Sequence, residues 1–112
     1  MTTITVDQIK DYLRNIEPIT PDLDPTGNME TIFIQEKDFR IWIGLTYDAH
    51  FISNRPATRE QPEEGEFEFT LDPVEDENID ILWRLNGEFH PFHYSMKNGE
   101  EIAEIINSKI II

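Results

Sequence analysis

Carboxylates are the side chains of this sequence that could most directly do chemistry, and their densest group lies in one stretch. No Lys or Arg separates Arg59 from Arg84, and this interval holds ten acids: Glu60, Glu63, Glu64, Glu66, Glu68, Asp72, Glu75, Asp76, Glu77 and Asp80. Such a group can act as a general acid and base, bind a hard cation, or present a negative surface to a basic protein. The residues around the acids decide among these three kinds of chemistry.

Acid–base catalysis needs carboxylates whose pKa values are separated by burial. Here the acids alternate with Phe67, Phe69 and Leu71 or lie in polar loops, so we expect them to stand in water while the apolar side faces a core. The serines Ser53, Ser95 and Ser108 have no glycine elbow around them. We therefore expect no catalytic site and no enzyme activity.

Metal binding is also disfavoured by spacing. The oxygen-rich segment Asp72, Glu75, Asp76 and Glu77 lacks the alternating acids and central glycine of an EF-hand loop. His90 and His93 are three residues apart and would point to opposite faces of a strand, unless Pro91 breaks it, so with His50 they make a poor zinc site. We expect neither a metal nor another cofactor.

The remaining chemistry is electrostatic. The 112 residues carry 23 acids and 9 bases, a formal charge of −14. This charge repels nucleic acid and anionic membranes and attracts basic proteins, although it can also serve only to keep the protein soluble. There is no cysteine, no basic leader followed by an apolar run, and no apolar run long enough to cross a membrane. We expect one domain over residues 1–112, in the cytoplasm of a host cell.

The elements that must position these groups begin with a helix over 5–16. Thr5 and Gln8 have the spacing of a capping box, and Pro18 ends the helix. The proline-rich segment 18–28 indicates a loop, and apolar alternation predicts strands over 31–35 and 39–47. We expect residues 48–62 to form a mobile loop.

In the second half of the sequence, apolar alternation predicts strands over 66–72 and 79–85. Asn86–Gly87 follows, which is typical of a type I′ hairpin turn. The hairpin places His90 opposite Trp83, and Pro91 makes the return strand 88–94 an edge strand. Asn98 and Glu101 resemble a cap before a helix over 99–109. The order predicts an α+β fold, an antiparallel sheet of four or five strands with the N-terminal and C-terminal helices on one face.

Trp42 lies on the opposite side of its strand from Phe39, Ile41, Ile43 and Leu45, which places it away from the helices. An exposed Trp among polar groups can anchor an interface, and it can equally cover its own sheet. Both interpretations stay open at this point.

The segment from Arg55–Pro–Ala–Thr through Pro62–Glu–Glu to Asn78–Ile–Asp–Ile81 resembles a pattern in small uncharacterised phage and prophage proteins. The resemblance covers residues 55–81, about a quarter of the chain. It implies a phage or mobile-element origin and a β-rich core in this region, and it transfers no activity.

These observations favour an acidic binding protein that occupies a basic, nucleic-acid-handling surface of a host protein, as a DNA mimic of the anti-defence or nuclease-inhibitor type would. The alternative is a structural or assembly accessory of a phage that uses apolar sheet-edge contacts. A homodimer is possible through the edge strand and the apolar tail 110–112. The residues expected to bind the partner are Glu63, Glu64, Glu66, Glu68, Asp72, Glu75, Asp76, Glu77, Asp80 and Trp42.

Overall fold

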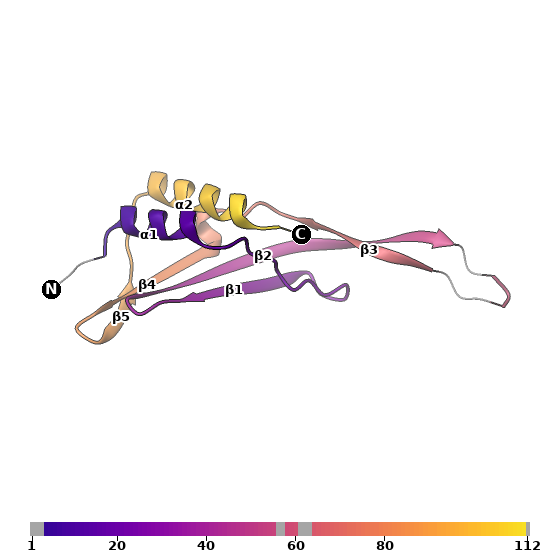
Figure 1. Ribbon diagram of the computed structural model, residues 1–112, viewed down its shortest axis with the longest axis horizontal. Coiled ribbons are helices and arrows are strands. Elements are labelled where there is room, and N and C mark those ends of the chain that lie inside the picture. The colour runs from indigo at the N-terminus through magenta and orange to yellow at the C-terminus, as the bar shows by residue number, and fades with distance from the viewer. Residues whose placement is uncertain (1–3, 56–57, 61–63, 112) are drawn as a thin grey trace.

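The computed structural model describes residues 4–55, 58–60 and 64–111. Two α-helices, five strands and one 3₁₀ turn follow one another along the chain (Figure 1). Their bounds are α1 Val6–Asn15, β1 Met29–Gln35, β2 Phe39–Arg55, β3 Glu64–Leu71, η1 Asp76–Asn78, β4 Ile79–Leu85, β5 Glu88–Pro91 and α2 Met96–Lys109. In the described part of the chain, no helix is long and apolar enough to cross a membrane.

Local sequence signals set most of these bounds. The capping box predicted for the first helix is confirmed, because the Gln8 amide donates to Thr5 Oγ1 at 3.2 Å and the Thr5 amide donates to Gln8 Oε1 at 2.8 Å. The hairpin between β4 and β5 is also confirmed, since Asn86 and Gly87 have φ of 54° and 82°. This positive φ is what a type I′ turn requires.

The sheet is antiparallel throughout, and four of its strands lie in the order β1-β2-β4-β5. The fifth strand, β3, pairs with the second half of β2. The Tyr47 amide bonds to Asn28 on the β1 side, and the Asp72 amide bonds to Thr46. Adjacent strand residues direct their backbone groups to opposite sides, so β3 lies on the edge of β2 away from β1. β5 is an edge strand, as predicted, although it ends at Pro91 and not at residue 94.

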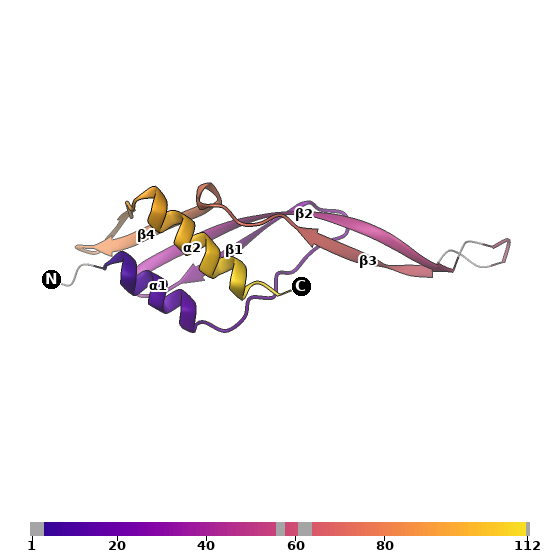
Figure 2. The same ribbon diagram turned by 90° about the horizontal axis from the view of Figure 1, so that it is seen from above.

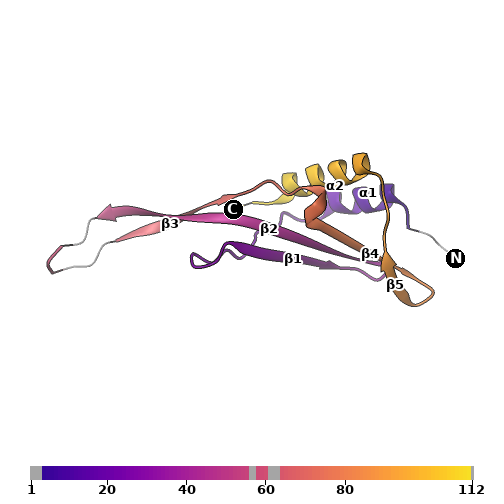
Figure 3. The same ribbon diagram turned by 180° about the vertical axis from the view of Figure 1, so that it is seen from behind.

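Both helices cover the same face of the sheet, which confirms the predicted α+β architecture (Figures 2 and 3). The core lies between these two layers. Buried aliphatic side chains come from α1, β2, β4 and α2: Ile9, Leu13, Ile41, Ile43, Leu45, Ile79, Ile81, Ile102 and Ile106. The alternation on β2 and β4 therefore marks the buried face correctly.

The last helix begins earlier than the sequence indicated. Ser95 is the N-cap, accepting from the Asn98 amide at 3.2 Å, and the helix starts at Met96, not at 99. Asn98 and Glu101 instead hold the buried ammonium of Lys10 on α1, which donates to both side chains. Asn98 and Glu101, whose spacing suggested a helix cap, therefore link α2 to α1. A buried cation such as the Lys10 ammonium requires hydrogen-bonding partners of this kind.

The molecule is far from spherical. It measures 70 × 26 × 22 Å and has a radius of gyration of 18.5 Å, whereas a compact chain of this length would have about 13 Å. The excess length comes from β2 and β3, which run together beyond the helices (Figure 1). The expectation of a loop over 48–62 was wrong for its first half, because β2 continues to Arg55.

Candidate partner-binding arm and open sheet face

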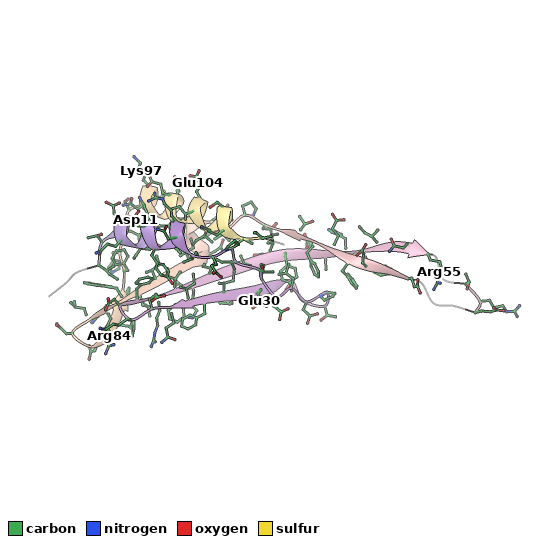
Figure 4. The ribbon with its side chains drawn as sticks, viewed as in Figure 1. Asp11, Glu30, Arg55, Arg84, Lys97 and Glu104 are labelled. Carbon is green, nitrogen blue, oxygen red and sulfur yellow. The ribbon has the colours of Figure 1, made fainter. Side chains whose placement is uncertain are left out.

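The extension is a two-stranded ribbon, here called the arm, made of Asp48–Arg55 of β2 and Glu64–Thr70 of β3. The register pairs Asp48 with Thr70 and Ser53 with Gly65, with an irregularity between Ser53 and Arg55. Figure 4 shows Arg55 at the far end of the ribbon and Arg84 at the opposite end of the molecule. The segment expected to be a loop therefore supplies half of the most prominent surface of the protein.

One face of the arm is aromatic. Phe51 lies opposite Phe67 with ring centroids 5.3 Å apart, and these side chains are 44% and 46% exposed. Nearer the body, Phe69 contacts Tyr47 and is half-buried. The prediction that the apolar side of this strand packs on the core was wrong for Phe67, because α2 ends at Lys109 and leaves this part of the arm uncovered. Exposed aromatic side chains of this kind mark interaction sites.

The other face of the arm is acidic. Asp48, Glu66 and Glu68 share it with His50 and Ile52, since Glu68 pairs with His50 and Glu66 with Ile52. All three carboxylates are exposed. Within the described part of the chain none of them has a cationic partner. Glu66 and Glu68 are separated by about 6.6–6.8 Å along the strand.

Glu64 differs from the sequence-based expectation. Its carboxylate accepts from Arg55 at 3.1 Å, so it is paired and not simply repelled by its neighbours. Glu63 lies outside the described residues. The arm thus presents on one face three carboxylates without a cationic partner among the described residues, and an ion pair near its far end.

The remaining predicted acids do not join this face. Glu75, Asp76 and Glu77 lie just before or within η1, which packs against α2, and Asp72 follows β3 directly. Asp80 lies on β4, cross-strand from Trp42. The structure therefore divides the predicted acidic surface into three groups, and only the arm acids stand on the projecting ribbon.

The arm also has open backbone edges. β1 begins at Met29, opposite Thr46, so this edge of β2 is not paired with any described strand from there toward Arg55. The outer edge of β3 is likewise without a strand partner among the described residues. Open edges are templates for pairing with another chain.

The face of the sheet away from the helices, here called the open face, carries the predicted Trp42. Its ring is half-buried and lies 4.9 Å from the Phe33 ring, centroid to centroid. The Arg40 guanidinium on the same face sits 4.0 Å from the Phe89 ring centroid. Trp42 thus both covers its own sheet and stands beside polar neighbours.

An open groove of about 530 Å³ lies next to Trp42 where β5 ends. Asp80, Leu82, Pro91, His93 and Tyr94 line it with the Trp42 ring. Burial raises the pKa of the Tyr94 phenol, and the carboxylates of Asp76 and Asp80 raise it further. The groove is therefore lined by the Asp80 carboxylate, and the Asp76 carboxylate also acts on the Tyr94 phenol.

Among the described residues, no group of three or more His, Asp or Glu side chains is arranged to hold a metal ion. The three histidines are separated, with His50 on the arm, His90 opposite Trp83 as predicted, and His93 in the groove. Sequence reasoning missed Phe51 as a functional candidate. The alternation Tyr47, Ala49, Phe51 continued the pattern of β2 and could have revealed it.

Comparison with known proteins adds no relative: no family model, no curated protein and no solved structure matches the chain.

Proposed function

We propose that this chain is a non-enzymatic acidic binding protein whose arm occupies a basic, nucleic-acid-handling surface of a host protein. The observation that carries the proposal is the acidic face of the arm, where Asp48, Glu66 and Glu68 stand exposed and unpaired among the described residues on a projecting ribbon. A fixed row of carboxylates competes with phosphates for Lys and Arg clusters, and charge complementarity accelerates the encounter. A DNA mimic of the phage anti-defence or nuclease-inhibitor type would work in this way.

The proposal is tested by capture from host lysate at low and moderate salt, followed by purification of the captured protein. We expect a basic protein whose retention falls as salt rises, and which DNA displaces from the arm. The matched control is a chain carrying Glu17→Gln and Glu104→Gln, two exposed acids outside the arm. A captured protein that DNA does not displace, or that binds equally to an arm-neutralised chain, contradicts the proposal.

A second function is favoured by a different observation. The aromatic face of Phe51 and Phe67 and the open edges of the arm suit a structural or assembly accessory of a phage, which would join neighbouring subunits by strand pairing. Burial of apolar surface resists salt, so retention that stays constant or rises with ionic strength favours this second function. Loss of retention in Phe51→Ser with Phe67→Ser, but not in the acid variants, would support it further.

A further inference from the structure

The open face carries one complete pairing of a cation with an aromatic ring and one incomplete pairing. Arg40 lies over Phe89, so this cation has its aromatic ring within the chain. On the neighbouring part of the sheet, Trp42 and Asp80 are cross-strand partners on the same face. Among the described residues, no Lys or Arg lines the groove that contains them. The second site has a ring and a carboxylate but no described cation.

The groove exists because β5 stops early. The Phe92 amide donates to the Ile81 carbonyl at 2.9 Å, after which the chain turns away toward α2. This leaves the edge of β4 around Asp80 without a strand partner among the described residues. The space beside Trp42 is therefore fixed by the fold, with Pro91 and Leu82 forming an apolar wall.

The charge of the groove indicates what it binds. Asp80 is exposed and has no ion pair among the described residues, and its carboxylate with that of Asp76 contributes to the raised pKa of Tyr94. A cation with a flat face satisfies both the ring and the carboxylate. Guanidinium is planar, stacks on Trp, and donates two parallel hydrogen bonds to a carboxylate, whereas ammonium is a compact, strongly hydrated point charge.

We propose that the groove between Trp42 and Asp80 is a binding site for an arginine side chain of the basic partner. The guanidinium stacks on the Trp42 ring and donates to the Asp80 carboxylate, while the aliphatic stem lies along Leu82 and Pro91. This inference rests on the proposed function, because it names the second contact that the same basic partner makes. It places that contact on the body of the molecule, apart from the arm.

The test needs no partner protein. Acetyl-arginine amide is titrated into the labelled chain at about 0.15 M salt, where long-range charge effects are screened, and the two indole N–H signals are followed by NMR. We expect a saturable shift of the Trp42 signal with little change at Trp83, which serves as the check on folding. Acetyl-lysine amide should bind several-fold more weakly, and the neutral isostere acetyl-citrulline amide should give no saturable shift.

Variants locate the site. Asp80→Asn should weaken binding about tenfold, since it removes a charge-assisted pair. Trp42→Leu, which lacks the indole signal and is followed by the backbone amide signals of Asp80 and Leu82, should weaken binding about threefold by removing the stacked ring. The matched control is Asp22→Asn, an exposed acid outside both the arm and the groove, which should leave the titration unchanged.

Equal weakening by Asp22→Asn and Asp80→Asn would overturn the proposal, because it would show general attraction to an acidic protein. A shift map of the unaltered chain that is centred on the arm, or no saturable shift at all, would also overturn it, whether or not a variant folds. Because these titrations omit the partner, failure here leaves the arm proposal intact. Failure of host-protein capture would remove the basic partner as the source of the arginine, while a saturable shift at Trp42 would still show that the groove binds arginine.

Discussion

Neutralising the acidic face of the arm should remove partner binding without unfolding the protein. The change is Asp48→Asn, Glu66→Gln and Glu68→Gln in one chain, leaving Glu64 in its pair with Arg55. Each of these three side chains is exposed and none has a cationic partner among the described residues. Their removal therefore relieves repulsion and breaks no described ion pair.

The size of the charge repulsion that is removed follows from the pairing register of β2 and β3. Glu66 and Glu68 are about 7 Å apart along β3, and Asp48 lies at a similar diagonal distance from Glu68. At this distance, two unit charges in water repel by about 0.6 kcal/mol, and the Debye length of about 8 Å at 0.15 M salt reduces this to about 0.25 kcal/mol. Two such pairs amount to about 0.5 kcal/mol of stabilisation in physiological salt, and to about 1 kcal/mol at 0.01 M salt.

The assay is thermal melting of the triple variant beside partner capture. We expect the melting temperature to rise by about 2–4 °C at physiological salt, with a larger rise at low salt. Capture of the basic partner should fall sharply and lose its salt dependence. Glu17→Gln with Glu104→Gln serves as the control and should change neither measurement appreciably.

Two results would refute this reasoning. A decrease of more than about 1 kcal/mol in the free energy of unfolding of the triple variant would mean that the arm acids have stabilising partners. Full capture by the variant would mean that the acidic face serves solubility alone.

Further predictions concern the body of the molecule and the geometry of the arm. Ile43→Ala should cost about 2–5 kcal/mol in urea unfolding, because this side chain is 0% exposed; a loss below about 1 kcal/mol would contradict the described core. The hydrogen bond from Lys10 lowers the pKa of Glu101 below its usual value, so this pair stabilises the fold above the unfolded-state pKa and ceases to do so as pH falls through the folded-state pKa. The melting temperature of Glu101→Gln should therefore be lower than that of the unaltered chain at neutral pH, and the two should converge in acid. A difference in melting temperature that does not change with pH would argue against the pair. Gly65→Ala would place a Cβ 2.1 Å from the Ile52 carbonyl oxygen, so we expect faster hydrogen exchange in the arm with the body unchanged; unaltered arm amides would refute the close approach.

The body of the fold could be predicted because its signals are local or depend on a single buried face. The capping box at Thr5, the Asn86–Gly87 turn and the alternation along β2 each describe a choice that the chain makes over a few residues. Those patterns gave the α+β class and the face that the helices cover. The start of α2 was misplaced because Asn98 and Glu101 have the spacing of a cap but serve the buried Lys10.

The arm could not be predicted in the same way. Its strands have solvent on both faces along most of their length, so their pairing leaves only a weak pattern of burial in the sequence. The alternation through Phe67 correctly indicated a strand, but burial depends on which element lies opposite, and that is a property of the tertiary structure. Likewise, sequence order grouped the arm acids with Glu75 and Asp80, whereas the excursion through η1 separates them in space.

The continuity of β2 has a consequence for the thermodynamics of recognition. One strand runs from Phe39 beneath the helices to Arg55 near the end of the arm. A partner that binds this ribbon does not have to order its backbone. Ordering a disordered segment would cost about 1–2 kcal/mol of conformational entropy for each residue. The same continuity couples the arm mechanically to the core. Because Ile41 and Ile43 are buried residues of the same strand, we expect a partner that twists the ribbon to strain the packing around them.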